Sequence, residues 1–134
     1  MYGHTEQMAQ AVARGAGEVS KNVLLYDISK TDVSLIVGDI FRYKGLILGS
    51  PTYCNDLFPP IKSLVDKLEL RGLKHRVFGA FGSYTWAGAA VKEFVAFAER
   101  MKWETPPTVE VKQAMTSDQS EALVQLGRTI ASQL

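Results

Sequence analysis

The sequence contains little of what several functional classes require. Its one cysteine, Cys54, excludes a disulfide within the chain and is typical of a reducing compartment, so we expect a cytoplasmic protein. One cysteine and two histidines are too few soft ligands for a zinc or iron–sulfur site, and we predict no metal. No apolar run approaches the roughly 18 residues of a membrane helix, and the first residues have no signal-peptide pattern.

The chain also lacks an excess of charge. Fifteen Lys and Arg against fourteen Asp and Glu give a net charge of +1. Nucleic-acid binders usually have a basic excess, and membrane-surface binders a polybasic stretch, so we expect neither partner. The hydrophobic fraction of 46% is too high for a disordered chain, and the length of 134 residues predicts a single domain over residues 1–134.

The spacing of apolar residues predicts that helices and strands alternate. The expected strands are the short apolar runs 23–26, 46–49, 77–82 and 108–111. The expected helices are about 5–19, 31–40, 59–68, 91–101 and 120–132. Such alternation predicts an α/β protein with a parallel sheet covered on both faces. The pattern is one strand short at its start, because the sequence opens directly on a loop and a helix.

Ligands of such sheets bind outside the carboxyl ends of the strands, where the strand order reverses. The segment Tyr2–Glu6 precedes the first helix, whose free N–H groups and dipole favour a phosphate. Gly3 allows a close approach of the backbone, and the Thr5 hydroxyl offers a hydrogen bond. The plainer alternative is that Thr5 only caps the helix and that His4 is an exposed loop residue.

Two further loops follow predicted strands. In the segment Ser50–Asp56, Asn55 offers a donor and an acceptor, which suits an imide-like ring edge. Cys54 has no activating base in sequence, so we predict no nucleophile. In the segment Gly82–Gly88, Tyr84 and Trp86 provide stacking surface for a flat ring, although one of them plugging the sheet edge is the alternative. The three loops together predict a binding site for a phosphorylated planar heterocycle. Trp103 lies outside these loops and is interpreted as a packing residue.

These loops resemble those of a known family. Met-Tyr-Gly-His-Thr-Glu, Gly-Ser-Pro-Thr-Tyr-Cys-Asn-Asp followed by Pro59–Pro60, and Gly-Ser-Tyr-Thr-Trp-Ala-Gly look like the three flavin-mononucleotide (FMN) loops of flavodoxin-like domains. More narrowly, they resemble the C-terminal flavodoxin domain of flavodiiron proteins (A-type flavoproteins). The resemblance covers nearly the whole chain. It implies a three-layer α-β-α sandwich with a doubly wound parallel sheet, and FMN bound without covalent attachment.

The resemblance also implies roles for twelve residues. Those around the ribityl phosphate are Tyr2, Gly3, His4 and Thr5. Those along one side of the isoalloxazine ring are Pro51, Thr52, Tyr53 and Asn55. Those of the other wall are Ser83, Tyr84, Trp86 and Gly88. Both Tyr84 and Trp86 remain candidates for the ring that stacks on the flavin.

Two departures from the family pattern affect these expectations. The family's first strand, with the serine that opens the phosphate loop, does not precede Met1. We therefore expect a fragment of a longer flavoprotein that binds flavin weakly on its own. In addition, Asp56 stands where the family often has asparagine, and the charge of +1 is far less acidic than that of simple flavodoxins. A domain docked to a partner is therefore favoured over a free-standing shuttle.

The leading functional hypothesis is an electron-transfer domain that accepts electrons from a reductase or rubredoxin-type donor and passes them to an acceptor such as a diiron centre. No residue is expected to act as catalytic acid, base or nucleophile. One alternative is a flavin-dependent NAD(P)H:quinone reductase on the same fold, and another is a truncated remnant without cofactor. A response-regulator receiver is disfavoured, because the acidic residues that it needs are missing. Homo-oligomer formation, the donor and the acceptor are left open.

Overall fold

Helices and parallel strands alternate along the chain. The structure, a computed structural model, describes residues 4–28, 30–53, 56–72, 76–84, 90–104, 106–112 and 117–134. Within these ranges the helices are α1 (His4–Gly17), α2 (Val33–Arg42), α3 (Pro59–Leu70), α4 (Ala90–Arg100) and α5 (Ser117–Ser132). The strands are β1 (Gly45–Tyr53), β2 (Asp56–Leu57), β3 (Val77–Tyr84) and β4 (Thr108–Lys112).

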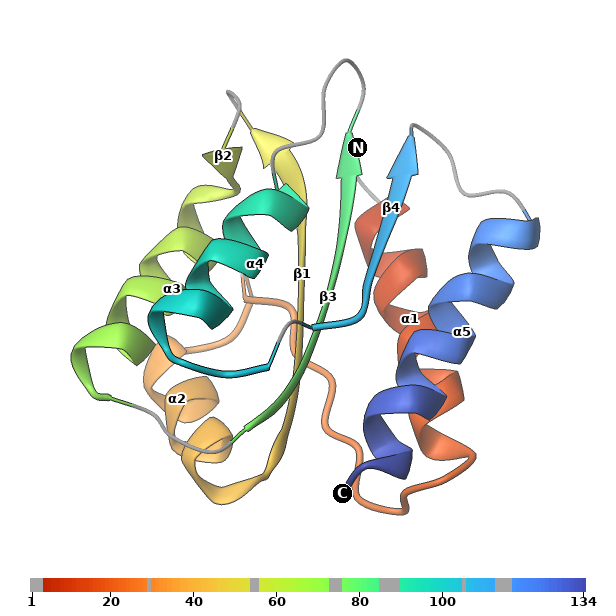
Figure 1. Cartoon of the computed structure of the whole chain (residues 1–134), viewed down its shortest axis with the longest axis horizontal. Helices are drawn as coiled ribbons and strands as arrows, with labels where there is room; N and C mark the ends of the chain where they lie inside the picture. Colours follow the sequence, from red (N-terminus) through yellow and green to blue (C-terminus); the bar gives the residue numbers. More distant parts are fainter. Residues whose placement is uncertain are drawn as a thin grey trace.

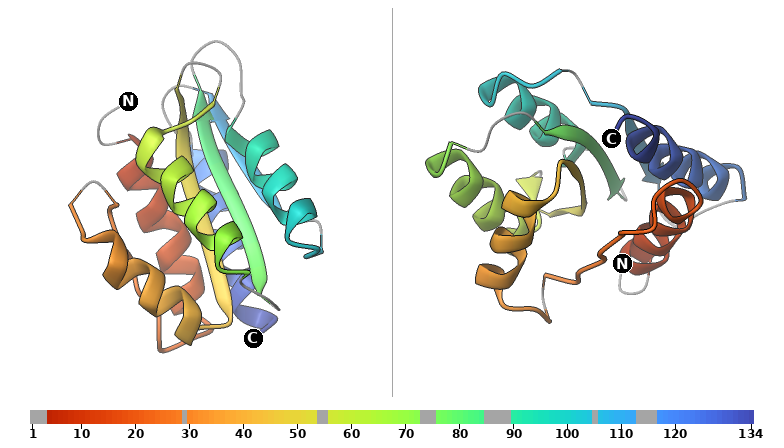
Figure 2. Two further views of the ribbon diagram at one scale, coloured as in Figure 1. Left: turned by 90° about the vertical axis from the view of Figure 1, so that its left-hand side faces the viewer. Right: turned by 90° about the horizontal axis from the view of Figure 1, so that it is seen from below.

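The described strands form one sheet in the order β2-β1-β3-β4. Both long pairings, β1 with β3 and β3 with β4, are parallel, whereas the short β2 pairs antiparallel with the end of β1. Helices α2, α3 and α4 cover one face of the sheet, and α1 and α5 cover the other (Figures 1 and 2). The predicted α/β sandwich of three layers with a parallel sheet is confirmed.

Alternation along the strands divides the buried side chains between two cores. Leu46 and Leu48 of β1 point into the core under α2, α3 and α4, while Ile47 packs toward α1 and α5. In the first core Trp103 contacts Phe78 and Phe97, with ring centroids 5.5 and 5.3 Å apart. Its interpretation as a packing residue is therefore confirmed.

Local sequence signals set the ends of two helices as expected. The Asp32 carboxylate accepts a hydrogen bond of 2.8 Å from the Ser34 N–H, which caps α2. Helix α3 begins at Pro59, where a missing N–H costs nothing. Its buried stripe comprises Ile61, Leu64, Val65 and Leu68.

The predicted strand at residues 23–26 is wrong. The segment 22–28 belongs to no strand ladder, and the side chains of Leu24 and Leu25 are 50% and 52% exposed. A strand needs a neighbour that pairs with its N–H and C=O groups, and no described strand supplies one here. An apolar run indicates burial, but it does not supply this neighbour.

Strand β1 is longer than predicted. The sequence indicated a break at 50–52, yet Pro51 stays in the sheet, aligned with Ser83 of β3. The Val77 N–H donates to the Lys44 carbonyl at 3.0 Å, and backbone groups alternate between the two sides of a strand. By this alternation the backbone N–H and C=O of Leu46 point toward β3, and the backbone of Pro51 points toward the outer edge of the sheet. The N–H that proline lacks is therefore not needed for the ladder.

Helices α1 and α5 contact each other through glycines. A Cβ atom on Gly127 would lie 2.0 Å from the Val12 carbonyl oxygen and 2.7 Å from the Ala16 nitrogen. A Cβ atom on Gly15 would lie 1.8 Å from the Val124 carbonyl oxygen. The two backbones therefore approach closer than any side chain permits, which fixes α1 on α5.

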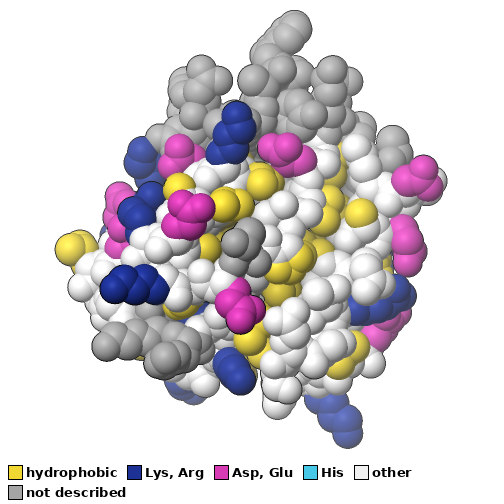
Figure 3. Space-filling model, in the orientation of Figure 1, with side chains coloured by type: hydrophobic (Ala, Val, Ile, Leu, Met, Phe, Trp, Pro, Cys, Tyr) yellow, Lys and Arg dark blue, Asp and Glu magenta, His cyan; other side chains and the backbone are white. Residues whose placement is uncertain are grey.

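On the face of the molecule that Figure 3 shows, charges of both signs are mixed. Figure 3, in the orientation of Figure 1, shows Lys and Arg interspersed with Asp and Glu, with small hydrophobic groups between them. Among the described residues, no helix is long and apolar enough to cross a membrane.

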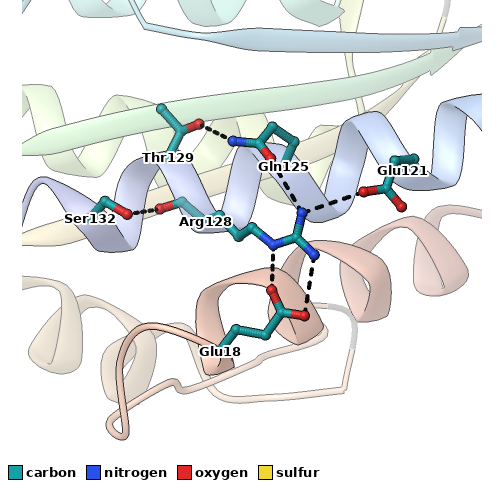
Figure 4. A network of polar contacts seen from close by, with 6 residues as sticks. All are labelled: Glu18, Glu121, Gln125, Arg128, Thr129 and Ser132. Atoms are coloured by element: carbon teal, nitrogen blue, oxygen red, sulfur yellow. Dashed lines mark hydrogen bonds and ion pairs between the residues drawn. The ribbon is translucent and has the colours of Figure 1, made fainter.

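An ion-pair network joins the ends of the α1–α5 pair (Figure 4). The Arg128 guanidinium donates hydrogen bonds to the Glu18 carboxylate just after α1, and to Glu121 and Gln125 on its own helix. The hydrogen bond from Arg128 lowers the pKa of Glu18. Because these side chains are largely exposed, the network contributes little energy but restrains where the chain leaves α1.

A second polar group anchors the segment 22–28 to α2. The Tyr26 hydroxyl and the Arg42 guanidinium both donate to the Asp39 carboxylate, and Asp39 is only 7% exposed. The hydrogen bond to Asp39 raises the pKa of Tyr26. The pKa of Asp39 is lowered, first by the hydrogen bond from Tyr26 and then by that from Arg42.

We predict that Gly127→Ala destabilises the protein by about 1–3 kcal/mol or more, because the new methyl group meets the backbone of α1. The matched control is Gly38→Ala on α2, where a Cβ atom has no neighbour within 4 Å. It should stabilise by roughly 0.5–1 kcal/mol through helix propensity alone. Urea unfolding followed by circular dichroism measures both, and equal effects would contradict the close contact of the helices.

The Tyr26–Asp39 pair predicts a dependence of stability on pH at both ends. Its contribution is present below a pH of about 10 and is lost as pH rises through the raised pKa of Tyr26. On the acid side it is present above a pH of about 4 and is lost as pH falls through the lowered pKa of Asp39. The difference in unfolding free energy between wild type and Tyr26→Phe should therefore shrink above about pH 10.

Tyr43→Phe is the control for this pH dependence, since it removes another tyrosine hydroxyl near α2 and leaves the Tyr26–Asp39 pair intact. Urea unfolding at several pH values from 7 to 11 measures the three proteins. A difference between wild type and Tyr26→Phe that stays constant over this range would show that the pair is not formed.

Candidate functional site

One edge of the sheet brings several chain segments together. Strands β1, β3 and β4 all end at the upper edge in Figure 1, and α1 begins at the same edge. The first turn of a helix leaves N–H groups without partners inside the helix, and these groups with the helix dipole attract an anion. The start of α1 at His4 therefore gives this edge a local preference for negative charge.

The arrangement of helices also marks this edge. The connections β1–α3–β3 and β3–α4–β4 cross one face of the sheet, whereas α1 lies on the opposite face with α5 (Figure 2). Helices therefore lie on both faces of the sheet beside the carboxyl ends of β1 and β3. In open parallel sheets, ligands bind outside the carboxyl ends of the strands.

The structure places seven of the predicted site residues at this edge. His4 and Thr5 open α1, and Pro51, Thr52 and Tyr53 end β1. Ser83 and Tyr84 end β3, with Ser83 aligned with Pro51 and itself buried. The predicted residues that lie outside the described ranges are Tyr2, Gly3, Asn55, Trp86 and Gly88.

Sequence reasoning missed Ser50 as a structural support of this edge. Ser50 is fully buried, and its hydroxyl accepts a hydrogen bond of 2.9 Å from the Phe58 N–H. This bond ties the end of β1 to the residue before α3. The signal in the sequence was a serine at the end of an apolar strand run, followed by Phe58 and two prolines, but a serine before proline also reads as a simple strand end.

Gly82 lets α4 approach the same edge. A Cβ atom there would lie 3.1 Å from the Ala90 Cβ and 3.3 Å from the Ser50 carbonyl oxygen. Larger side chains would push the start of α4 away from the end of β3. A glycine at this position thus permits close packing of α4 against the end of β3.

The residues present fit an FMN group. The open first turn of α1 suits its phosphate, and the ends of β1 and β3 at the same edge supply backbone groups and the buried Ser83. Among the described residues, no group of three His, Cys, Asp or Glu side chains is arranged to hold a metal ion.

Comparison with known proteins supports this interpretation. The family model described as Flavodoxin matches residues 1–127. An anaerobic nitric oxide reductase flavorubredoxin of Enterobacter sp. (strain 638) is 31% identical over 135 residues, which cover 99% of this chain and 28% of that protein. A flavorubredoxin of Klebsiella pneumoniae is 30% identical with the same coverage. The chain thus spans less than a third of the length of these relatives.

Solved structures show the same fold. Rubredoxin oxygen:oxidoreductase from Desulfovibrio gigas superposes with a TM-score of 0.93 at 28% identity, over 99% of this chain and 33% of that one. Oxidised flavodoxin 1 from Bacillus cereus gives a TM-score of 0.80 at 23% identity, over 100% of this chain and 93% of that one. With the fold, the carboxyl-edge site and the family match in agreement, the chain belongs to the flavodoxin family and is an FMN-binding, electron-transfer domain.

Proposed function

We propose that residues 1–134 act as one domain that holds FMN at the carboxyl edge of the sheet and transfers electrons between partner proteins. The donor is a reductase or a rubredoxin-type protein, and the acceptor is a site such as a diiron centre on a partner domain. The observation that supports this proposal most directly is the meeting of the α1 N-terminus with the ends of β1 and β3 at one edge. The names of the similar flavorubredoxins and of the oxidoreductase from Desulfovibrio gigas support the choice of donor.

The residues of the chain bind and orient the cofactor. Tyr2, Gly3, His4 and Thr5 would hold the phosphate, where the α1 dipole stabilises its charge. The residues proposed to line the ring are Pro51, Thr52, Tyr53, Asn55, Ser83, Tyr84, Trp86 and Gly88. When bound, FMN supplies the redox chemistry, so the chain needs no acid, base or nucleophile of its own.

The near-neutral charge favours docking to a partner domain over free diffusion as a highly acidic shuttle. We place this docked domain in the cytoplasm, in keeping with the single cysteine. The alternative of an NAD(P)H:quinone reductase is not favoured, because the similar curated proteins are flavorubredoxins.

The double variant Thr5→Ala, Trp86→Ala should lose FMN. Loss of a hydrogen bond to a charged phosphate and of ring stacking together weaken binding by about 3 kcal/mol, roughly 100-fold. Absorption spectra before and after adding FMN and desalting measure its retention, and fluorescence titration measures the affinity. The matched control is Thr129→Ala, Tyr43→Ala, which alters the same residue classes away from the carboxyl edge and should keep wild-type affinity. Equal affinity in the two double variants would exclude these loops as the site.

The 134-residue chain alone is expected to bind FMN weakly, because along Gly45–Gly49 the described β1 has a strand neighbour on one side only. Titration of the 134-residue chain measures this directly, and a tight complex would contradict the expectation. Rapid oxidation of NADPH by the FMN-loaded chain, without an added reductase, would instead support the quinone-reductase alternative.

A further inference from the structure

The outer face of α2 carries exposed apolar side chains. On its inner face Ile36, Val37 and Ile40 belong to the core between the helices and the sheet. On the outer face the side chains of Leu35 and Phe41 are 55% and 42% exposed. A helix usually presents polar residues to solvent on this side. Large apolar groups gathered there indicate a surface that contacts another molecule.

Gly38 forms a low point in the middle of this outer face. Residues three or four positions apart are neighbours on a helix, so Leu35, Phe41 and Arg42 surround this glycine. A Cβ atom on Gly38 would have no neighbour within 4 Å in the described chain. The space above its backbone therefore accepts a side chain from another molecule, with an apolar group on either side.

The end of α2 beside this low point is basic. The exposed run from Phe41 to Lys44 contains two cations and no acidic residue. The C-terminus of a helix has partial negative charge, which by itself repels an anion. Here the Arg76 guanidinium donates to the carbonyls of Ile40 and Phe41 at 3.2 and 3.1 Å, which offsets that charge. This end of the helix therefore attracts carboxylates.

Arg42 is held in position on this surface before anything binds. Its guanidinium donates to the Asp39 carboxylate and lies 5.8 Å from the centre of the Tyr43 ring. The side chain of Arg42 is 69% exposed, whereas that of Asp39 is only 10% exposed. The cation thus faces solvent and its counter-ion lies beneath it. A cation that is already ordered loses less conformational entropy when it pairs with a carboxylate of a partner.

We propose that the α2 surface is a docking site for an acidic amphipathic helix of a partner protein. The residues of this surface are Leu35, Gly38, Phe41, Arg42 and Lys44. An apolar side chain of the partner sits over Gly38, and Glu or Asp side chains one turn away pair with Arg42 and Lys44. Exposed apolar groups next to cations favour such a helix over a nucleic acid, which is bound mainly through its phosphates.

The α2 surface is separate from the proposed flavin site. Helix α2 ends at Arg42, directly before β1 begins at Gly45, so this surface extends to the sheet edge opposite the carboxyl ends of the strands (Figure 1). The inference therefore does not rest on the proposed function, and loss of FMN binding would leave it unchanged.

A labelled peptide tests the docking. The probe is fluorescein-Glu-Glu-Leu-Ala-Glu-Leu-Leu-Ala-Glu-Leu-Glu-amide. One control peptide has Lys at every Glu position, and the other has Ser at every Leu position. Fluorescence anisotropy with the full chain should show saturable binding of the probe and at least tenfold weaker binding of each control. Binding of the probe should also weaken as NaCl is raised from about 50 to about 500 mM.

Substitution at Gly38 tests the low point. Gly38→Gln puts a side chain into the space that the partner occupies, and it should weaken binding of the probe at least tenfold. The matched control is Gly17→Gln at the end of α1, on the opposite face of the sheet, where a Cβ atom also has no neighbour within 4 Å. It should keep wild-type affinity. Circular dichroism verifies that both variants fold, and equal affinity of the two would overturn the proposal.

Charge reversal tests the basic end of the surface. Lys44→Glu should weaken binding of the probe at least tenfold, whereas Arg14→Glu on the exposed side of α1 changes the net charge equally and should not. Absence of probe binding, equal binding by these two variants, or binding of phosphatidylserine vesicles in place of the probe would each overturn the proposal. So would self-association through α2, detected by sedimentation and abolished by Gly38→Gln.

Discussion

The alternating direction of the backbone groups along β1 is the constraint on which the site and the sheet edge both depend. Every second residue of β1 directs its N–H and C=O groups at β3, and the residues between them direct these groups away from β3. This parity lets Pro51 remain in the strand, so β1 reaches the carboxyl edge beside Ser83. The same parity directs the N–H and C=O groups of Ile47 and Gly49 away from β3. One hydrogen-bond register thus sets how far β1 extends and where the proposed flavin loop begins.

Most of the fold could be predicted from the sequence because its signals are local. The cap at Asp32, the prolines at the start of α3 and the apolar stripe of that helix each act within a few residues. The prediction of a strand at 23–26 was wrong for the opposite reason, because a strand depends on a pairing partner that is often distant in sequence. Similarly, whether Pro51 ends a strand depends on which side its missing N–H would face, and no local pattern reveals that.

The site was predictable to a smaller extent. From the rule that ligands bind at the carboxyl ends of parallel strands, we predicted correctly that the start of α1 and the ends of β1 and β3 lie at one edge. Ser50 was missed because its role depends on Phe58, which reaches it only when β2 and α3 fold back. The chemistry of the loops came from resemblance to a family, and the residues of those loops that lie outside the described ranges remain predictions.

The position of α1 is set by its contact with α5 more than by its contact with β1. Gly15 and Gly127 place the backbones of α1 and α5 in direct contact, and α5 in turn lies on Gly45 and Gly79 of the sheet through Ile130. Substitutions at these glycines would meet atoms within 3 Å, so the stack from sheet to α5 to α1 has little freedom. The first turn of α1 is therefore held at the carboxyl edge by contacts on the α5 side.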